Sequence, residues 1–198
     1  MSYSSHNQPV RAPPAVSDYE LIDSDPHFKR VVSYMRPLDF GVWAALAVAM
    51  PAALVAWEKL EPAAGLFKAP AKVPAGALRA TTLLGFFGGF YLAYVRSSKR
   101  FLGWSENLRE VAKDRYEIKK LLSEGRNPYH TDKSTLDDRL QDTANKFSQY
   151  SFLNLAVIPW FNWAYHPYHG VDIKKYYEDR PGEEAWGFKL KPLDEIPK

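Results

Sequence analysis

Two long runs without a charged residue stand out in a chain that is otherwise polar, aromatic and rich in proline. They extend from Phe40 to Trp57 and from Ala80 to Val95. As a helix, the first run would rise about 27 Å, close to the thickness of the hydrocarbon core of a bilayer. Neither run alternates apolar and polar residues at helical spacing, so neither has a water-exposed face. The pattern predicts an all-α membrane protein built on a two-span transmembrane helical hairpin.

The alternative interpretation is that both runs are core helices of a soluble protein. Aromatic residues near the ends of the runs favour the membrane, since Trp and Tyr gather at membrane–water interfaces. They are Trp43, Trp57, Tyr91 and Tyr94. We therefore predict a hairpin with an extended N-terminal arm and a helical or irregular C-terminal strap. The predicted elements are an arm with a short helix at 1–38, transmembrane helices at 39–57 and 75–96, a loop at 58–74, amphipathic helices at 97–150, and an aromatic interfacial segment with an extended tail at 151–198.

Both predicted spans are only weakly hydrophobic. The first contains seven alanines and is interrupted by Pro51. In the second, Gly85 and Gly89 form a GxxxG pair, a spacing that lets another helix approach the backbone closely. Coincidence is the alternative, because glycine is frequent in membrane helices. We predict Gly85 and Gly89 as helix-packing residues, on spans that pack against other proteins.

Basic residues flank the spans and predict their orientation. Those before the first span are Lys29, Arg30 and Arg36, and those directly after the second are Arg96, Lys99 and Arg100. The loop between the spans is also basic, but its cations lie beside Glu58 and Glu61. The positive-inside rule then places both termini on the cytoplasm-like side, which in a mitochondrion is the matrix.

Four residues that follow the second span are candidate contacts for anionic lipid. They are Arg96, Lys99, Arg100 and Trp104. Anionic lipid such as cardiolipin is attracted at about 1 kcal/mol per basic residue near the membrane surface. Ordinary positive-inside flanking is the alternative interpretation of the same residues.

Short helices are expected on both sides of the hairpin. Asp25 before Pro26 predicts the start of a helix that ends before Pro37. After the second span, a helical tract should run from Arg96 to Glu124 and end at Gly125. Its apolar stripe would consist of Leu108, Val111, Ile118 and Leu122, interrupted by Arg115. A further amphipathic helix is predicted near Ser134. Its narrow stripe suits docking onto a partner.

The stretch Phe147–Gly170 is aromatic and carries no formal charge. Pro159 and Pro167 make it a poor spanning helix. Its uninterrupted apolar part, as a helix, would be shorter than the hydrocarbon core of a bilayer is thick. We expect a segment that lies at headgroup depth or packs against a membrane partner, with a third span as the alternative.

Little in the sequence indicates catalysis, a cofactor or nucleic acid. The chain has no cysteine, which excludes disulfides and thiolate ligation of iron–sulfur clusters. A net charge of +3 is too small to indicate a nucleic-acid surface. Two sets resemble metal ligands: Asp23, Asp25 and His27, and His166, His169 and Asp172. A helix start explains the first set, and a structural loop in which ring nitrogens bond to carbonyls explains the second. We therefore predict no catalytic, cofactor-binding or metal-binding residues.

Several segments together resemble a known family. They are Tyr19–Phe28, Arg36-Pro37, Pro159–Asn162, His169–Asp172 and Lys175–Tyr177. In this order they are similar to the fungal-type twenty-one-kilodalton accessory subunit of mitochondrial NADH:ubiquinone oxidoreductase, respiratory complex I. The resemblance does not extend to the charged tail after Glu178. It implies a two-span subunit of the inner mitochondrial membrane, docked on the proton-pumping membrane arm and holding no flavin, iron–sulfur centre or catalytic residue.

The leading hypothesis is a non-catalytic accessory subunit that stabilises assembly of the membrane arm of complex I. Its partners would be other subunits of that arm and membrane phospholipid. The main rival is a stand-alone two-span protein that tethers or shapes the inner membrane. A membrane metalloenzyme that uses His166, His169 and Asp172 is the third hypothesis.

Overall fold

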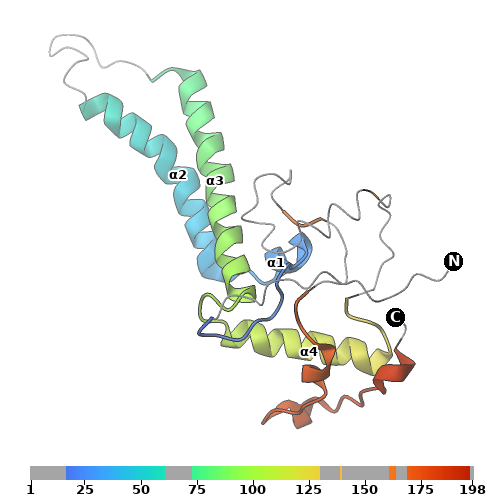
Figure 1. Ribbon diagram of the computed structural model, residues 1–198. Coiled ribbons are helices and arrows are strands. Elements are labelled where there is room, and N and C mark those ends of the chain that lie inside the picture. The colour runs from blue at the N-terminus through green and yellow to red at the C-terminus, as the bar shows by residue number, and fades with distance from the viewer. Residues whose placement is uncertain (1–16, 61–72, 130–138, 140–160, 164–168, 197–198) are drawn as a thin grey trace, which may run out of the picture.

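The computed structural model describes residues 17–60, 73–129, 139, 161–163 and 169–196. Within these ranges every regular element is a helix and there is no β-strand, which confirms the all-α fold class. Two long helices rise side by side from a smaller helical body (Figure 1). The elements are α1 (Phe28–Ser33), α2 (Pro37–Leu60), α3 (Ala75–Phe101), α4 (Leu108–Glu124) and the 3-10 turns η3 (Ile173–Tyr176), η4 (Glu183–Trp186) and η5 (Leu193–Glu195).

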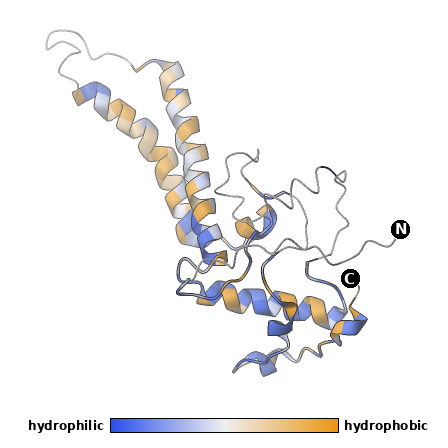
Figure 2. Ribbon diagram, in the orientation of Figure 1, coloured by the Kyte–Doolittle hydropathy of each residue, from blue (hydrophilic) through white to orange (hydrophobic). Residues whose placement is uncertain are grey.

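The helices α2 and α3 form the predicted hairpin. They contain 24 and 27 residues, so they would be about 36 and 40 Å long. Both are long and apolar enough to cross a membrane. Apolar residues predominate along α2 between its polar ends (Figure 2), and none of the residues in its most apolar window is buried within the chain. Pro51 lies inside α2 without ending it. Each helix extends past both ends of its apolar run, since α2 covers Pro37–Leu60 and α3 covers Ala75–Phe101.

The connection after the second span differs from the predicted continuous tract. The helix α3 ends at Phe101, and α4 begins only at Leu108, at a large angle to the hairpin (Figure 1). Gly103 adopts φ +70°, and a Cβ atom there would lie 2.4 Å from the carbonyl oxygen of Tyr19. The turn therefore requires glycine, and it closes against the N-terminal arm. The predicted end of the tract is confirmed, since Gly125 caps α4 in the left-handed conformation.

The start of α1 also differs from the prediction. His27, not Asp25, is the N-cap, and its Nδ1 accepts a hydrogen bond from the backbone N–H of Lys29 at 3.2 Å. The helix has six residues and ends at Ser33, before the predicted end at Arg36. The carboxylate of Asp25 does not cap the helix, because Asn162 donates to it from another part of the chain at 3.1 Å.

Two apolar clusters form the core. One joins the arm, α1, the lower part of α3 and the start of α4. It consists of Ile22, Val31, Tyr34, Met35, Ala93, Tyr94, Phe101, Leu102 and Val111. The other attaches the C-terminal strap to α4 and consists of Ile118, Leu122, Tyr176 and Ile196. The predicted stripe of α4 was wrong at Leu108, which is 73% exposed. The predicted helix near Ser134 and most of Phe147–Gly170 lie outside the described residues.

Candidate functional site at the base of the hairpin

The glycine pair of α3 lies directly against α2. A Cβ atom at Gly85 would lie 2.6 Å from the carbonyl oxygen of Leu46, and one at Gly89 would lie 2.8 Å from that of Trp43. The indole Nε1 of Trp43 donates to the Phe86 carbonyl oxygen at 2.9 Å beside this contact. The helix that approaches the two glycines therefore belongs to this chain, whereas the sequence pattern predicted packing against another protein.

Asp39 organises the base of the hairpin. It lies in the first turn of α2 and is completely buried. Its carboxylate accepts the backbone N–H of Arg36 at 2.8 Å and the Nε of Arg96 at 3.2 Å. It also pairs with the Nη2 of Arg100. A carboxylate at the start of one span thus holds two arginines near the end of the other.

Glu110 extends this network to α4. It is buried, with its Oε1 3.3 Å from the Nε of Arg100 and 2.7 Å from the Nε of Arg36. The bond to Glu110 raises the pKa of the Arg36 guanidinium, which also pairs with Glu106 at 2.9 Å. Charged hydrogen bonds of this kind are stronger than neutral ones.

We call Arg36, Asp39, Arg96, Arg100 and Glu110 the hairpin junction. Arg36 directly precedes α2, and Asp39 lies in α2. Arg96 and Arg100 lie in α3, and Glu110 lies in α4. Asp39, Arg100 and Glu110 are buried, so the charge of each depends on its partners for stability. The hairpin junction therefore fixes the angle between the hairpin and the helical body.

The four residues predicted to contact lipid differ in their exposure to solvent. The side chain of Arg100 is 6% exposed and lies between Asp39 and Glu110. Its guanidinium is therefore unavailable to a headgroup, and the prediction for this residue is corrected. Arg96, Lys99 and Trp104 are all exposed.

A second buried network attaches the N-terminal arm to α4. Arg30 pairs with Asp23 at 3.0 Å and with Asp114. The Nδ1 of His169 lies 2.8 Å from Asp23, and the hydroxyl of Tyr176 donates to Asp114 at 2.7 Å. Burial opposes ionisation of Asp23, but the charges of His169 and Arg30 outweigh it, so its pKa lies below the ordinary value. Burial raises the pKa of Asp114 in spite of Arg30.

This arrangement bears on the two candidate metal sets. The carboxylate of Asp23 pairs with Arg30 and contacts the Nδ1 of His169. His169 therefore bonds to a carboxylate, whereas a carbonyl partner was expected. Among the described residues, no group of three or more His, Asp or Glu side chains is placed to hold a metal ion. His166 lies outside those residues.

A third network fastens the C-terminal strap to α4. Arg115 pairs with Glu183 and donates to the carbonyl oxygen of Lys175 at 3.1 Å. Lys119 lies 2.6 Å from both Glu183 and Asp179. The hydrogen bond from Arg115 lowers the pKa of Glu183 to about 2. Arg115, which only interrupts an apolar stripe in the sequence, is thus the main anchor of the strap.

The substitution Glu183→Gln should destabilise the chain most at neutral pH. Because the pKa of Glu183 is about 4.5 when unfolded and about 2 when folded, its contribution is complete above pH 4.5 and is lost as the pH falls toward 2. The difference in unfolding midpoint between wild type and Glu183→Gln should therefore shrink over that interval. Thermal unfolding in detergent measures it, with the exposed Glu178→Gln as the control. A difference that is constant with pH would contradict the assignment.

Local sequence patterns identify none of the charged residues of α4 as members of these buried networks. Glu110, Asp114, Arg115 and Lys119 all lie on the buried side of α4, beside Val111. Charges that recur at core positions of an amphipathic helix are the signal that could have found them, since such residues are rarely buried unless paired.

Comparison with known proteins identifies the family of this chain. Residues 16–106 match the family of the complex I 21 kDa subunit of NADH-ubiquinone oxidoreductase, and residues 115–198 match the C-terminal family of the same subunit. The second match includes the charged tail after Glu178 to which the resemblance did not extend. The NADH-ubiquinone oxidoreductase 20.9 kDa subunit of Neurospora crassa is 42% identical over 171 residues, which cover 84% of this chain and 85% of that protein. The chain therefore belongs to the family of 21 kDa subunits of NADH-ubiquinone oxidoreductase, complex I.

Proposed function

We propose that the protein is a non-catalytic accessory subunit that stabilises assembly of the membrane arm of complex I. The observation that carries the proposal is the hairpin junction, in which Asp39 and Glu110 join both spans to α4 through Arg100. A rigid link between a membrane hairpin and a folded body lets one chain hold two sets of neighbours in a fixed relation. The buried charges of the hairpin junction, Asp39, Arg100 and Glu110, pair with one another in this link.

The surface of the hairpin supports a location in the membrane. Large apolar side chains on it are exposed, among them Val48 at 67%, Trp57 at 69% and Phe87 at 64%. Apolar patches of this extent mark contact with lipid or with other proteins. We propose that one part of this surface contacts other subunits of complex I and that the rest faces the lipid of the inner mitochondrial membrane.

The orientation proposal rests on the charges at the base of the hairpin. Lys29, Arg96 and Lys99 are exposed near this end, and the chain enters and leaves the hairpin there. The positive-inside rule favours the matrix for such an end, so both termini would lie in the matrix. Protease added to intact mitoplasts should then spare epitope tags at either terminus and digest them only after the inner membrane is opened.

Deletion of the gene tests the function directly. We expect fewer assembled complexes, with normal NADH oxidation in each complex that remains, because the subunit supplies contacts and no catalytic group. Quantification on native gels together with turnover per complex distinguishes the two effects. Normal abundance with reduced turnover would contradict the proposal, and extraction of the chain by alkaline carbonate would contradict its membrane location. Migration in small oligomers, without the near-megadalton band, would favour a tether.

A further inference from the structure

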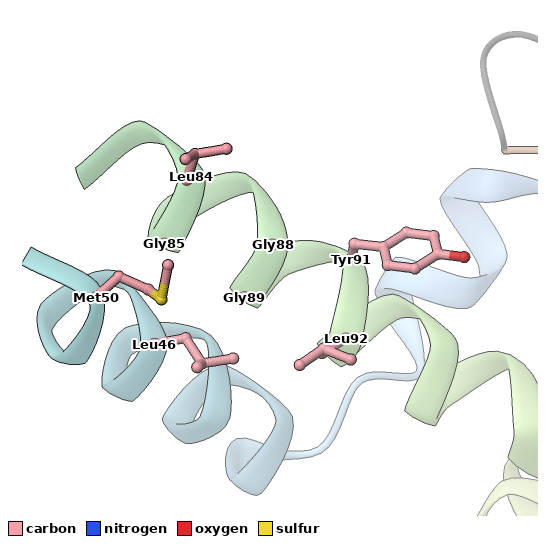
Figure 3. Close-up of a pocket in the computed structure, with 8 residues that line it drawn as sticks. All are labelled: Leu46, Met50, Leu84, Gly85, Gly88, Gly89, Tyr91 and Leu92. Carbon is pink, nitrogen blue, oxygen red and sulfur yellow. The ribbon is translucent and has the colours of Figure 1, made fainter. Parts of the chain in front are cut away.

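An apolar groove runs along one side of the hairpin where α2 and α3 meet (Figure 3). Its volume is about 300 Å³. The lining residues are Leu46 and Met50 of α2 and Leu84, Gly85, Gly88, Gly89, Tyr91 and Leu92 of α3. Gly88 differs from the two packing glycines, because a Cβ atom there would meet nothing within 4 Å. The missing side chain at Gly88 therefore leaves space that α2 does not fill.

Exposed cations follow Leu92, the last residue of α3 that lines the groove, along the same helix. Residues 88, 92, 95 and 99 recur at spacings of four, three and four, so Gly88, Leu92 and Lys99 lie on one face of the helix. Lys99 follows Gly88 by about 16 Å along the axis. Arg96 lies beside this line, on the side of α2, where its Nε contacts Asp39 at 3.2 Å.

The charges at this end are not equivalent. Arg96 is partly neutralised by Asp39, although its side chain is 47% exposed. Lys99 is exposed and takes part in no ion pair among the described residues. A ligand that enters this end of the groove therefore meets a net positive charge, and Lys99 is its main source.

We propose that the groove holds one acyl chain of an anionic phospholipid, whose phosphate binds Lys99 beside Arg96. This inference rests on the proposed location of the hairpin in the membrane. A volume of about 300 Å³ is at the lower end for a ligand pocket, which suits a single extended chain. The apolar walls fit hydrocarbon, and the cations at the end fit the charge of the headgroup.

Photocrosslinking in the purified complex tests the proposal. The probes are phosphatidylglycerol and phosphatidylcholine that carry a diazirine on one acyl chain, added to complex extracted in mild detergent. Mass spectrometry should find labels on the groove residues of α2 and α3, with the anionic probe favoured roughly fivefold or more, as expected for one basic residue near a membrane surface. Equal labelling by the two probes would overturn the role of the headgroup.

Two matched pairs of variants separate the acyl chain from the headgroup. Lys99→Glu should abolish the preference for the anionic probe, and Lys120→Glu, on an exposed face of α4, should not. Gly88→Leu should fill the groove and reduce labelling by both probes. Gly76→Leu should not, since Gly76 is equally open but lies near the other end of α3.

The outcomes distinguish this site from the proposed function. If the variants assemble normally and labelling does not depend on Lys99 or Gly88, the lipid site is wrong and the accessory role stands. Crosslinks from the groove to a helix of another subunit, with no lipid label, would replace the lipid with a protein neighbour. Absence of the chain from the complex would instead contradict the proposed function.

Discussion

Replacement of Arg100 by Gln is expected to destabilise the protein by about 3–5 kcal/mol, the usual cost of removing one partner from a buried ion pair. Asp39 and Glu110 would both remain buried, and each would lose a cation that now contacts it. The glutamine amide can donate to one carboxylate but brings no charge. Denaturant unfolding of the full-length chain in detergent measures the loss, and on native gels the amount of chain in the assembled complex should fall.

Arg96→Gln is the matched control for this experiment. Arg96 contacts the same carboxylate of Asp39, but 47% of its side chain is exposed, compared with 6% for Arg100. An ion pair that is open to solvent contributes only about 0–1 kcal/mol, so this variant should remain close to wild type. Similar losses for the two variants would show that burial does not set the strength of the hairpin junction.

The double substitution Gly85→Ala/Gly89→Ala should separate the two spans. Each new Cβ atom would lie within 3 Å of a carbonyl oxygen of α2, at Leu46 and Trp43. A backbone oxygen cannot rotate away as a side chain can, so the whole helix must move. Overpacking of this kind costs about 1–3 kcal/mol at each site. Thermal denaturation in detergent and abundance of the assembled complex should both show the loss.

The control for this variant changes two glycines that no neighbour approaches. Gly41 in α2 and Gly76 in α3 have open space at the Cβ position. Alanine favours helix over glycine by about 0.8–1.0 kcal/mol, so Gly41→Ala/Gly76→Ala should leave stability unchanged or raise it. The two double variants are therefore expected to act with opposite sign. If both double variants raised stability, helix propensity would explain the result and close packing would not.

Part of the fold could be predicted from local patterns alone. The two uncharged runs predict the hairpin because a helix of their length and composition suits a bilayer, and α2 and α3 contain these runs. Gly125 predicts the end of α4, since glycine adopts the left-handed cap conformation without strain. These features depend on residues that are close together in the sequence.

The predictions that were wrong depend on contacts between segments that are distant in the sequence. The cap of α1 was assigned to Asp25, but Asn162 lies 137 positions away in the sequence and binds that carboxylate instead. A continuous helical tract was predicted from Arg96 to Glu124, but α3 ends at Phe101 and α4 begins at Leu108. The break at Gly103 arises where the N-terminal arm packs against the turn. In both cases a contact between distant segments overrode a local preference.

In the candidate site, too, local patterns identified residues but not their partners. Gly85 and Gly89 could be identified by their spacing, but the identity of the helix against them could not. The same holds for the basic group, where Arg100 and Lys99 look alike in the sequence. One is buried between two carboxylates and the other is exposed, because Glu110 is brought beneath α3 by the turn before α4.

The sequence by itself determined the class of this protein. Two uncharged runs, a GxxxG pair and basic flanks are enough to specify a membrane hairpin, since bilayer thickness and helix geometry act on each run separately. Only the tertiary structure decided which charges are buried and joined. The pairs Arg100–Asp39, Arg30–Asp114 and Arg115–Glu183 are separated by 61, 84 and 68 positions, and a buried charge is stable only where folding brings its partner to it.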